Sequence, residues 1–269
     1  MNFMNFLSEY LFLHSSLPCM VFLMVISPIN FKNNPATIMS MASKKGKPSP
    51  SDSGTDPNSI LIVCAHSDDQ IFGPGGTVAR YAREGKFVHT IIFSYGEKSL
   101  PLHQKEYTVK ARVKEAMVVD KYLGGKGVTF LGLEEGKFSE QFIRKKMYPK
   151  LKRLILQYNP GVIFTHSMDD PMPDHRALNK LLIETVDKMR YRCDVYMFDV
   201  WNVFNFKKRH YVKIVIDISS TFDMKVKALR MFTSQKLSLF SLMWSVYLRA
   251  WLSGKDIKAK YAETFYKIR

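Results

Sequence analysis

Residues 60–65 read Ile-Leu-Ile-Val-Cys-Ala, and this unbroken apolar run ends directly at His66. A short continuous apolar run bounded by turn residues is typical of a strand that is buried on both faces, as in a parallel sheet. The residues that follow, His66-Ser67-Asp68-Asp69-Gln70, are polar, and a Gly/Pro-rich turn comes after them at 73–76. This stretch therefore predicts a central strand with a polar loop at its carboxyl end.

Similar apolar runs alternate with segments of helical spacing along the rest of the chain. We expect strands at 60–65, 87–93, 128–131, 162–165, 195–200 and 212–216. We expect helices at 77–83, 109–123, 138–158, 176–190, 221–232 and 240–252. The last of these has the spacing of a core helix, with contact to a lipid or aglycone as the alternative. Strands and helices in alternation predict a Rossmann-like α/β fold, a mostly parallel sheet flanked by helices.

The first 58 residues differ from the rest in composition. Residues 17–26 are apolar, but a stretch of about ten residues is only half of the roughly 20 that a transmembrane helix needs. No Lys or Arg precedes Lys32, although a signal peptide starts with basic residues. Residues 43–54 have the composition of a linker. We expect a poorly ordered extension at 1–58 and a folded domain at 59–269, with a membrane anchor as the alternative.

The charge balance is strongly basic, with 40 Lys and Arg against 24 Asp and Glu and a net charge of +16. A surplus of this size favours anionic partners such as phosphate-bearing substrates, nucleic acid or anionic lipid. The basic residues are scattered, and no nucleic-acid recognition motif accompanies them. We expect a solvated basic surface and no nucleic-acid partner, with peripheral contact to anionic lipid as the alternative. The composition leaves the oligomeric state open.

The chain has three cysteines, Cys19, Cys64 and Cys193, and no Cys-x-x-Cys pair. A sparse and odd set of this kind argues against a disulfide framework. We therefore expect reduced thiols and a cytoplasmic location.

Two polar clusters follow predicted strands. The first begins at His66, and the second runs from His166 to His175 as His-Ser-Met-Asp-Asp-Pro-Met-Pro-Asp-His. Ligands bind at the carboxyl ends of the strands in open parallel sheets, so these loops form the expected site. A catalytic zinc takes three protein ligands and leaves a place for water. The side chains of His66, Asp69 and His175 could supply the ligands, and Asp68 could act as general base.

A structural interpretation competes with the metal site. An Asp that follows a strand can simply cap the next helix, and an isolated His is more often structural than a ligand. A single His-x-Asp-Asp run would therefore be weak evidence for a metal site. Two such clusters at strand ends, within an alternating α/β pattern, favour metal binding.

The first cluster, Ala65-His66-Ser67-Asp68-Asp69-Gln70 with Gly75-Gly76-Thr77 after it, resembles the AHPDDE…GGT signature of the LmbE-like / PIG-L family of N-deacetylases. Asp174-His175-Arg176-Ala177 is similar to the end of that family's H-x-D-H loop. Weaker similarities continue as far as Tyr261-Ala262-Glu263. The resemblance therefore spans the chain from about residue 59 onward.

This resemblance implies a Rossmann-like fold and a zinc-dependent N-deacetylase. The substrate would be an N-acetylated amino sugar, such as a GlcNAc-like group, or a glycoconjugate that carries one. The family's metal ligands correspond to His66, Asp69 and His175, and its general base corresponds to Asp68. The implied cofactor is one Zn²⁺ ion, which would polarise the acetyl carbonyl for attack by water.

Three departures from the family pattern leave the expected ligands unchanged. Ser67 replaces a proline, which loosens the turn. Gln70 replaces a glutamate and keeps its hydrogen-bonding capacity without the charge. Glu135 stands near the position of a sugar-contacting Asp in the family.

A fourth departure concerns the mechanism. Met172 stands where the family has a histidine that is implied to steady the oxyanion or to protonate the leaving amine, and a thioether does neither well. We expect His166 to take over this task, with Asp169 and Asp170 as alternatives.

Two further functions compete with an active deacetylase. The changes at Gln70 and Met172 are compatible with a degenerate member that binds metal and glycan without turnover. The basic charge alone is compatible with a nucleic-acid-binding module, whose binding would depend steeply on salt.

Overall fold

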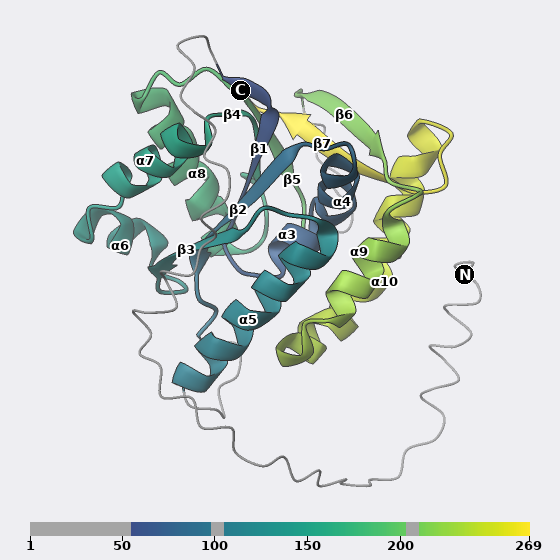
Figure 1. Ribbon diagram of the computed structural model, residues 1–269, viewed down its shortest axis with the longest axis horizontal. Helices are drawn as coiled ribbons and strands as arrows, with labels where there is room; N and C mark the ends of the chain where they lie inside the picture. Colours follow the sequence, from purple (N-terminus) through teal and green to yellow (C-terminus); the bar gives the residue numbers. More distant parts are fainter. Residues whose placement is uncertain (1–54, 98–104, 203–209) are drawn as a thin grey trace, which may run out of the picture. The chain divides into compact units, whose positions relative to one another are not determined.

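The computed structural model describes residues 55–97, 105–202 and 210–269 (Figure 1). Most of the predicted extension at 1–58 lies outside these residues, and the first described strand begins at Asp56. In the described part of the chain, no helix combines the length and the apolar character that crossing a bilayer requires.

A single sheet of seven strands, in the order β3-β2-β1-β4-β5-β7-β6, forms the centre of the fold. Its strands are β1 (Asp56–Cys64), β2 (Phe87–Ser94), β3 (Val128–Leu133), β4 (Pro160–His166), β5 (Asp194–Phe198), β6 (Val212–Asp217) and β7 (Ala262–Lys267). The pairings among β1 to β5 are parallel, whereas β7 pairs antiparallel with both β5 and β6. The prediction of a mostly parallel α/β sheet is therefore confirmed.

Helices cover both faces of the sheet (Figure 1). One face carries α6 (Phe138–Arg144), α7 (Tyr148–Tyr158) and α8 (Pro173–Lys188). The other face carries α3 (Asp69–Phe72), α4 (Gly75–Arg83), α5 (Lys105–Leu123), α9 (Phe222–Arg230) and α10 (Lys236–Asp256). The apolar run at 60–65 is 0–1% exposed between these two layers, as expected for a strand that is buried on both sides.

The strand order reverses between β1 and β4. From β1 the chain builds outward through β2 and β3, and it then returns to place β4 on the opposite side of β1. Such a reversal leaves a crevice at the carboxyl ends of the two central strands, where open α/β sheets bind their ligands. His66 follows β1, and His166 is the last residue of β4. Both predicted polar clusters thus begin at this crevice.

Three elements differ from the predictions. The single helix expected at 138–158 is divided into α6 and α7, because Lys146 takes a positive φ of 50° between them. The one-turn helix α3 (Asp69–Phe72) occupies part of the region expected to be a polar loop, just before the glycine-rich turn. Strand β7 was not predicted, since its sequence Ala-Glu-Thr-Phe-Tyr-Lys mixes charged and apolar residues without a clear strand pattern.

Candidate active site

Three side chains from separate elements meet at the crevice. His66 lies in the loop after β1, Asp69 is the first residue of α3, and His175 lies in the first turn of α8. The Asp69 Oδ2 atom lies 3.3 Å from His66 Nδ1 and 3.4 Å from His175 Nε2. One ligand atom from each residue lies within 4.8 Å of the others. The structure therefore brings together the three residues that were predicted as metal ligands.

The chemistry of this donor set fits a divalent metal ion. His175 is fully buried, and neither nitrogen of its ring makes a hydrogen bond of ordinary geometry with the described residues. A buried polar atom without a partner is costly unless an ion or water satisfies it. Two imidazoles and one carboxylate are also a usual ligand set for catalytic zinc. Residues His66, Asp69 and His175 could thus hold such an ion.

Asp170 orients His175 from behind. Its Oδ1 atom lies 3.0 Å from His175 Nδ1 and accepts the Met172 N–H at 3.0 Å. Its Oδ2 atom accepts the N–H groups of Val200 and Trp201, both at 3.4 Å. A carboxylate on the outer nitrogen of a metal-binding histidine fixes the ring and directs the other nitrogen to the metal. No local feature of the sequence distinguishes Asp170 from Asp169 in this role.

The electrostatics of the cluster favour an ionised Asp69. Burial opposes this ionisation, but the neighbouring His175 and His166 rings outweigh burial and hold the pKa of the Asp69 carboxyl well below its usual range. Burial likewise opposes protonation of His175, whereas Asp69 and Asp170 raise the pKa of its ring to about 9. The cluster thus gathers negative charge around its imidazoles, which also suits a bound cation.

Asp68, the predicted general base, lies beside the ligand set and is 8% exposed. Burial raises the pKa of its carboxyl, while Arg112, with Nη2 at 3.5 Å from Asp68 Oδ1, opposes this rise. Arg112 also donates from Nε to the Ser67 hydroxyl at 3.2 Å, a bond that a proline at position 67 could not accept. Arg112 therefore contacts both the turn and the carboxyl that the turn presents.

Carboxylates line the exposed side of His66. Its Nε2 atom lies 3.4 Å from Asp174 Oδ2 and 3.9 Å from Glu135 Oε1. The Asp174 carboxylate also accepts the Gly136 N–H, at 2.9 and 3.0 Å. Burial opposes protonation of His66, but Asp174 and Asp69 raise the pKa of its ring to about 10. Asp174 belongs to the family's H-x-D-H loop, but the sequence interpretation assigned it no role.

His166 lies on the buried side of the cluster. Its ring is 0% exposed and stacks on that of His175 with 3.7 Å between the ring centroids. The His166 Nε2 atom accepts the Ala65 N–H at 3.0 Å and lies 3.2 Å from Asp69 Oδ2. Burial, together with the neighbouring His175 ring, lowers the pKa of His166 to about 4. His166 is therefore a neutral ring that contacts two of the candidate ligands.

A buried ion pair supports the short helix α3, which begins at Asp69. Lys225 of α9 and Glu263 of β7 are 3% and 7% exposed, and Lys225 Nζ lies 2.6 Å from Glu263 Oε1. The same ammonium group donates to the carbonyls of Phe72 and Gly73, at 3.0 and 2.8 Å. These carbonyls belong to the end of α3, so Lys225 contacts the helix that starts at Asp69.

The Glu263 carboxylate holds the next helix as well. It accepts the N–H groups of Gly76 and Thr77, at 2.9 and 2.8 Å, in the first turn of α4. A carboxylate at a helix N-terminus satisfies unpaired N–H groups and interacts favourably with the helix dipole. The Lys225–Glu263 pair therefore fixes α3 and α4 on both sides of the glycine-rich turn.

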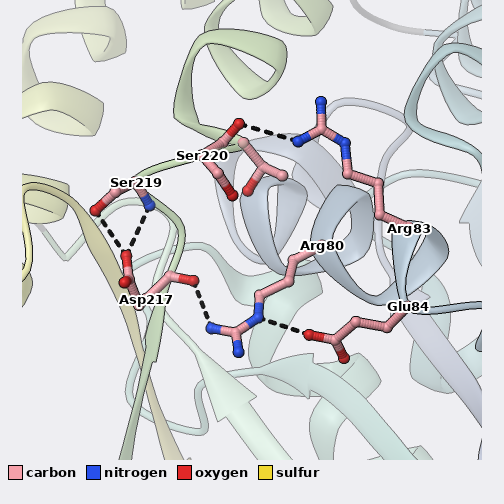
Figure 2. A pocket seen from close by; sticks show the side chains of 7 residues that line it. Arg80, Arg83, Glu84, Asp217, Ser219 and Ser220 are labelled. Atoms are coloured by element: carbon pink, nitrogen blue, oxygen red, sulfur yellow. Dashed lines mark hydrogen bonds and ion pairs between the residues drawn. The ribbon is translucent and has the colours of Figure 1, made fainter.

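A pocket on the surface, shown in Figure 2, shares no residue with the cluster of candidate ligands. Arg80 donates to the Glu84 carboxylate and to the Asp217 carbonyl, both at 2.8 Å. Arg83 donates to the Ser220 carbonyl at 3.1 Å. Both guanidinium groups are thus engaged within the chain, and two carboxylates offset their charge. This pocket lies between α4 and the segment that connects β6 to α9, and we assign it no ligand.

The fold and the clustered residues together agree with the resemblance to the LmbE-like class of α/β proteins. The family model of PIG-L, described as GlcNAc-PI de-N-acetylase, matches residues 61–186, just under half of the chain. The matched segment runs from β1 into α8. It contains the candidate ligands but ends before Lys225 and Glu263.

Similar proteins include deacetylases and a hydratase. The chain is 26% identical over 225 residues to 4-oxalmesaconate hydratase of Pseudomonas putida, covering 77% of this chain and 83% of that protein. It is 26% identical over 162 residues to 1D-myo-inositol 2-acetamido-2-deoxy-alpha-D-glucopyranoside deacetylase of Mycobacteroides abscessus, covering 49% of this chain and 57% of that protein. The chain thus spans little more than half of this deacetylase.

A solved structure supports the fold assignment. N,N'-diacetylchitobiose deacetylase from Pyrococcus horikoshii superimposes on this chain with a TM-score of 0.66 at 20% sequence identity. The superposition covers 79% of this chain and 84% of that one. This likeness concerns the fold alone.

Proposed function

We propose that this chain is a zinc-dependent N-deacetylase that removes the acetyl group from a GlcNAc-like sugar or glycoconjugate. The observation that carries the proposal is the convergence of His66, Asp69 and His175 at one crevice, with the Asp68 carboxyl beside them. The match of residues 61–186 to the PIG-L family model supports the reaction class. A divalent ion held by these residues would supply water with a lowered pKa and a Lewis acid for the acetyl carbonyl.

Asp68 is the proposed general base. Its carboxyl takes the proton of the attacking water and is placed by Arg112, which contacts both Asp68 and Ser67. Because burial raises the pKa of Asp68, its carboxylate is a stronger base than an exposed aspartate. The same carboxyl, once protonated, can return the proton to the leaving amine.

His166 remains the proposed substitute for the missing family histidine at Met172. It lies against Asp69 and stacks on His175 from the buried side, and its ring is 0% exposed, so any help to the reaction would pass through these two neighbours. Its neutral ring accepts the Ala65 N–H at Nε2, which leaves Nδ1 as its donor, and this atom has no hydrogen-bond partner among the described residues. The carboxyl of Asp170 is already engaged by His175 and by three N–H groups, which makes it a weaker candidate for this task.

The carboxylates at the site favour a neutral, hydroxyl-rich substrate. Glu135 and Asp174 are partly exposed beside His66, with side chains 15% and 10% accessible. Ionised carboxylates accept hydrogen bonds from sugar hydroxyls and repel acid anions. This lining supports an amino sugar as the group that is bound next to the candidate metal position.

A second candidate function is hydration of an unsaturated acid. It is favoured by the hydratase of Pseudomonas putida, whose alignment covers more of this chain than the deacetylase alignment does. The same base and metal could activate water for addition to a double bond. The acidic lining argues against it, because an acid anion would meet the carboxylates of Glu135 and Asp174.

Release of a primary amine from acetylated sugars tests the proposal. The protein is loaded with zinc and incubated with N-acetylglucosamine, N-acetylglucosaminyl inositol conjugates and, in parallel, 4-oxalmesaconate. Amine release that disappears in Asp68→Asn supports the deacetylase. Consumption of 4-oxalmesaconate without amine release would identify a hydratase. Zinc binding with neither activity would identify a degenerate, glycan-binding member.

The proposed location is the cytoplasm. Cys64 and Cys193 are free thiols, as expected in a reducing compartment. Contact with anionic lipid is the proposed peripheral interaction, and one helix supplies a surface for it.

A further inference from the structure

Helix α10 carries an apolar stripe on its outer face. Between residues 242 and 254 the exposed positions are Trp244, Trp251 and Leu252, which are 38%, 44% and 41% exposed. These positions, with the half-buried Leu248, recur at the spacing of one helical face. The opposite face packs on the sheet through Met243, Val246, Tyr247 and Ala250. The expectation of a core helix at 240–252 therefore holds for one face only.

A solvent-facing stripe normally carries charged side chains. The single charged residue between 242 and 254, Arg249, is half-buried and donates to the Asp199 carbonyl at 2.5 Å. It therefore does not interrupt the stripe. Together with Trp201, all three tryptophans of the chain are at least 36% exposed. Exposed tryptophans aligned along one helix mark an interaction surface rather than ordinary solvent contact.

The end of the stripe is basic. Lys255, Lys258 and Lys260 are exposed, and Lys255 Nζ lies 3.5 Å from the centroid of the Trp251 ring. The nearby Asp256 carboxylate is paired with Lys213 at 2.5 Å, so it does not cancel these charges. The stripe thus joins large amphipathic rings to lysines for which the described residues supply no carboxylate partner. This combination is typical of helices that lie in the headgroup region of a membrane.

We propose that the outer face of α10, defined by Trp244, Leu248, Trp251 and Leu252 with the lysines at 255, 258 and 260, docks on a lipid surface rich in anionic headgroups. Charge complementarity selects this occupant, since the chain carries a net charge of +16 and the cytoplasmic faces of membranes are negative. The helix lies along the surface, because no described helix is suited to span a bilayer.

The docking helix is connected to the candidate site. The Asp199 carbonyl that accepts from Arg249 lies in the segment after β5, and this segment also carries Trp201, whose N–H binds Asp170 behind His175. Docking through α10 would hold the crevice next to glycoconjugates that are anchored in the membrane. This consequence rests on the proposed function, whereas lipid binding itself does not.

The test uses the full chain and two kinds of vesicle, phosphatidylcholine alone and phosphatidylcholine mixed with phosphatidylserine. Wild-type protein is expected to cosediment with the anionic vesicles, with a shift of tryptophan emission to shorter wavelength. Trp244→Ser combined with Trp251→Ser should weaken binding at least about tenfold. Lys255→Gln and Lys258→Gln leave the stripe intact, and each should weaken binding to the anionic vesicles about fivefold. Added salt should weaken wild-type binding in the same way.

A matched control is Leu156→Ser on α7, an exposed apolar position that is 52% accessible and lies on another helix. Its vesicle binding should equal that of the wild type. Absence of wild-type binding to anionic vesicles overturns the proposal, and so does unchanged binding of both stripe and lysine variants. If the stripe variants change only the sedimentation mass of the free protein, the surface is a contact between copies and the proposal is wrong. Amine release from a water-soluble substrate is measured separately, so that failure of the activity and failure of docking are distinguishable.

Discussion

Lys225 and Glu263, which are 38 residues apart, form a buried ion pair whose two members hold the two helices around the glycine-rich turn of the candidate site. Removing one partner from a buried pair leaves an uncompensated charge. We expect Lys225→Met and Glu263→Leu each to lower the free energy of unfolding by about 3–5 kcal/mol. The double variant should lose less than the two single variants together. Urea unfolding measures all three.

A surface ion pair provides the control for this comparison of single and double variants. Lys180 and Glu184 lie 3.9 Å apart on α8, and both side chains are largely exposed. Single substitutions there should cost at most about 0.5 kcal/mol. Additive losses at Lys225 and Glu263, equal to the sum of the single variants, would show that the two residues do not act as a pair.

Substitution of a candidate ligand should empty the metal position. His175→Ala is expected to reduce the zinc content from about one ion per chain to near zero, because only two of the three ligands remain. Metal analysis of the purified protein measures the loss. His210→Ala, which changes an exposed histidine outside the cluster, should keep the wild-type content. Unchanged zinc in His175→Ala would remove this residue from the ligand set.

Substitution of the proposed base should separate binding from turnover. Asp68→Asn keeps the size of the side chain but cannot accept a proton from water, so kcat should fall by roughly 100- to 10,000-fold. The zinc content should stay at the wild-type value, because Asp68 is not among the proposed ligands. Loss of zinc together with activity would instead identify Asp68 as a ligand and exchange its role with that of Asp69.

The role of His166 can be separated from packing by a rescue experiment. His166→Gln should lower kcat roughly 100- to 1,000-fold if its ring serves the oxyanion or the leaving amine. Met172→His should then restore part of the activity in the double variant. Zinc content is measured in the same samples, because His166 lies 3.2 Å from Asp69. Turnover within a few-fold of the wild type in His166→Gln would assign this ring to packing alone.

Asp120 predicts a dependence of stability on pH that arises away from the candidate metal ligands. It is 3% exposed, and burial raises the pKa of its carboxyl from 3.8 to about 7, although the Gly127 N–H opposes the rise. Between these values the folded chain keeps a proton that the unfolded chain has lost, so this residue makes stability fall as the pH rises. Above about pH 7 the effect is complete.

Asp120→Asn removes this titration and keeps an oxygen for the Gly127 N–H. Relative to the wild type, the variant should therefore gain free energy of unfolding between about pH 4 and about pH 7, by a few kcal/mol at most. Urea unfolding of both proteins across this range measures the difference. A constant difference at all pH values would show that Asp120 has an ordinary pKa.

The sequence predicted the parts of the fold that rest on local signals. Apolar runs such as 60–65 located the central strands, and polar residues at strand ends located His66 and His175, because the carboxyl ends of parallel strands share one edge. The remaining features depend on pairings between distant residues. The Gly76 N–H meets a Glu263 oxygen across 187 positions, and no local periodicity marks either residue. Strand β7 escaped prediction for the same reason, since its partners define it.

The place of β7 in the sheet also governs the order in which the chain can fold. It lies between β5 and β6, yet it is the last described strand to leave the ribosome. Until residues 262–267 are synthesised, β6 has no strand to pair with and α4 lacks the carboxylate of Glu263. Nascent chains that end before this strand should therefore hold an open sheet edge and an unsupported glycine-rich turn. Such chains are expected to depend on chaperones, and the candidate site would reach its final structure only after β7 has been synthesised.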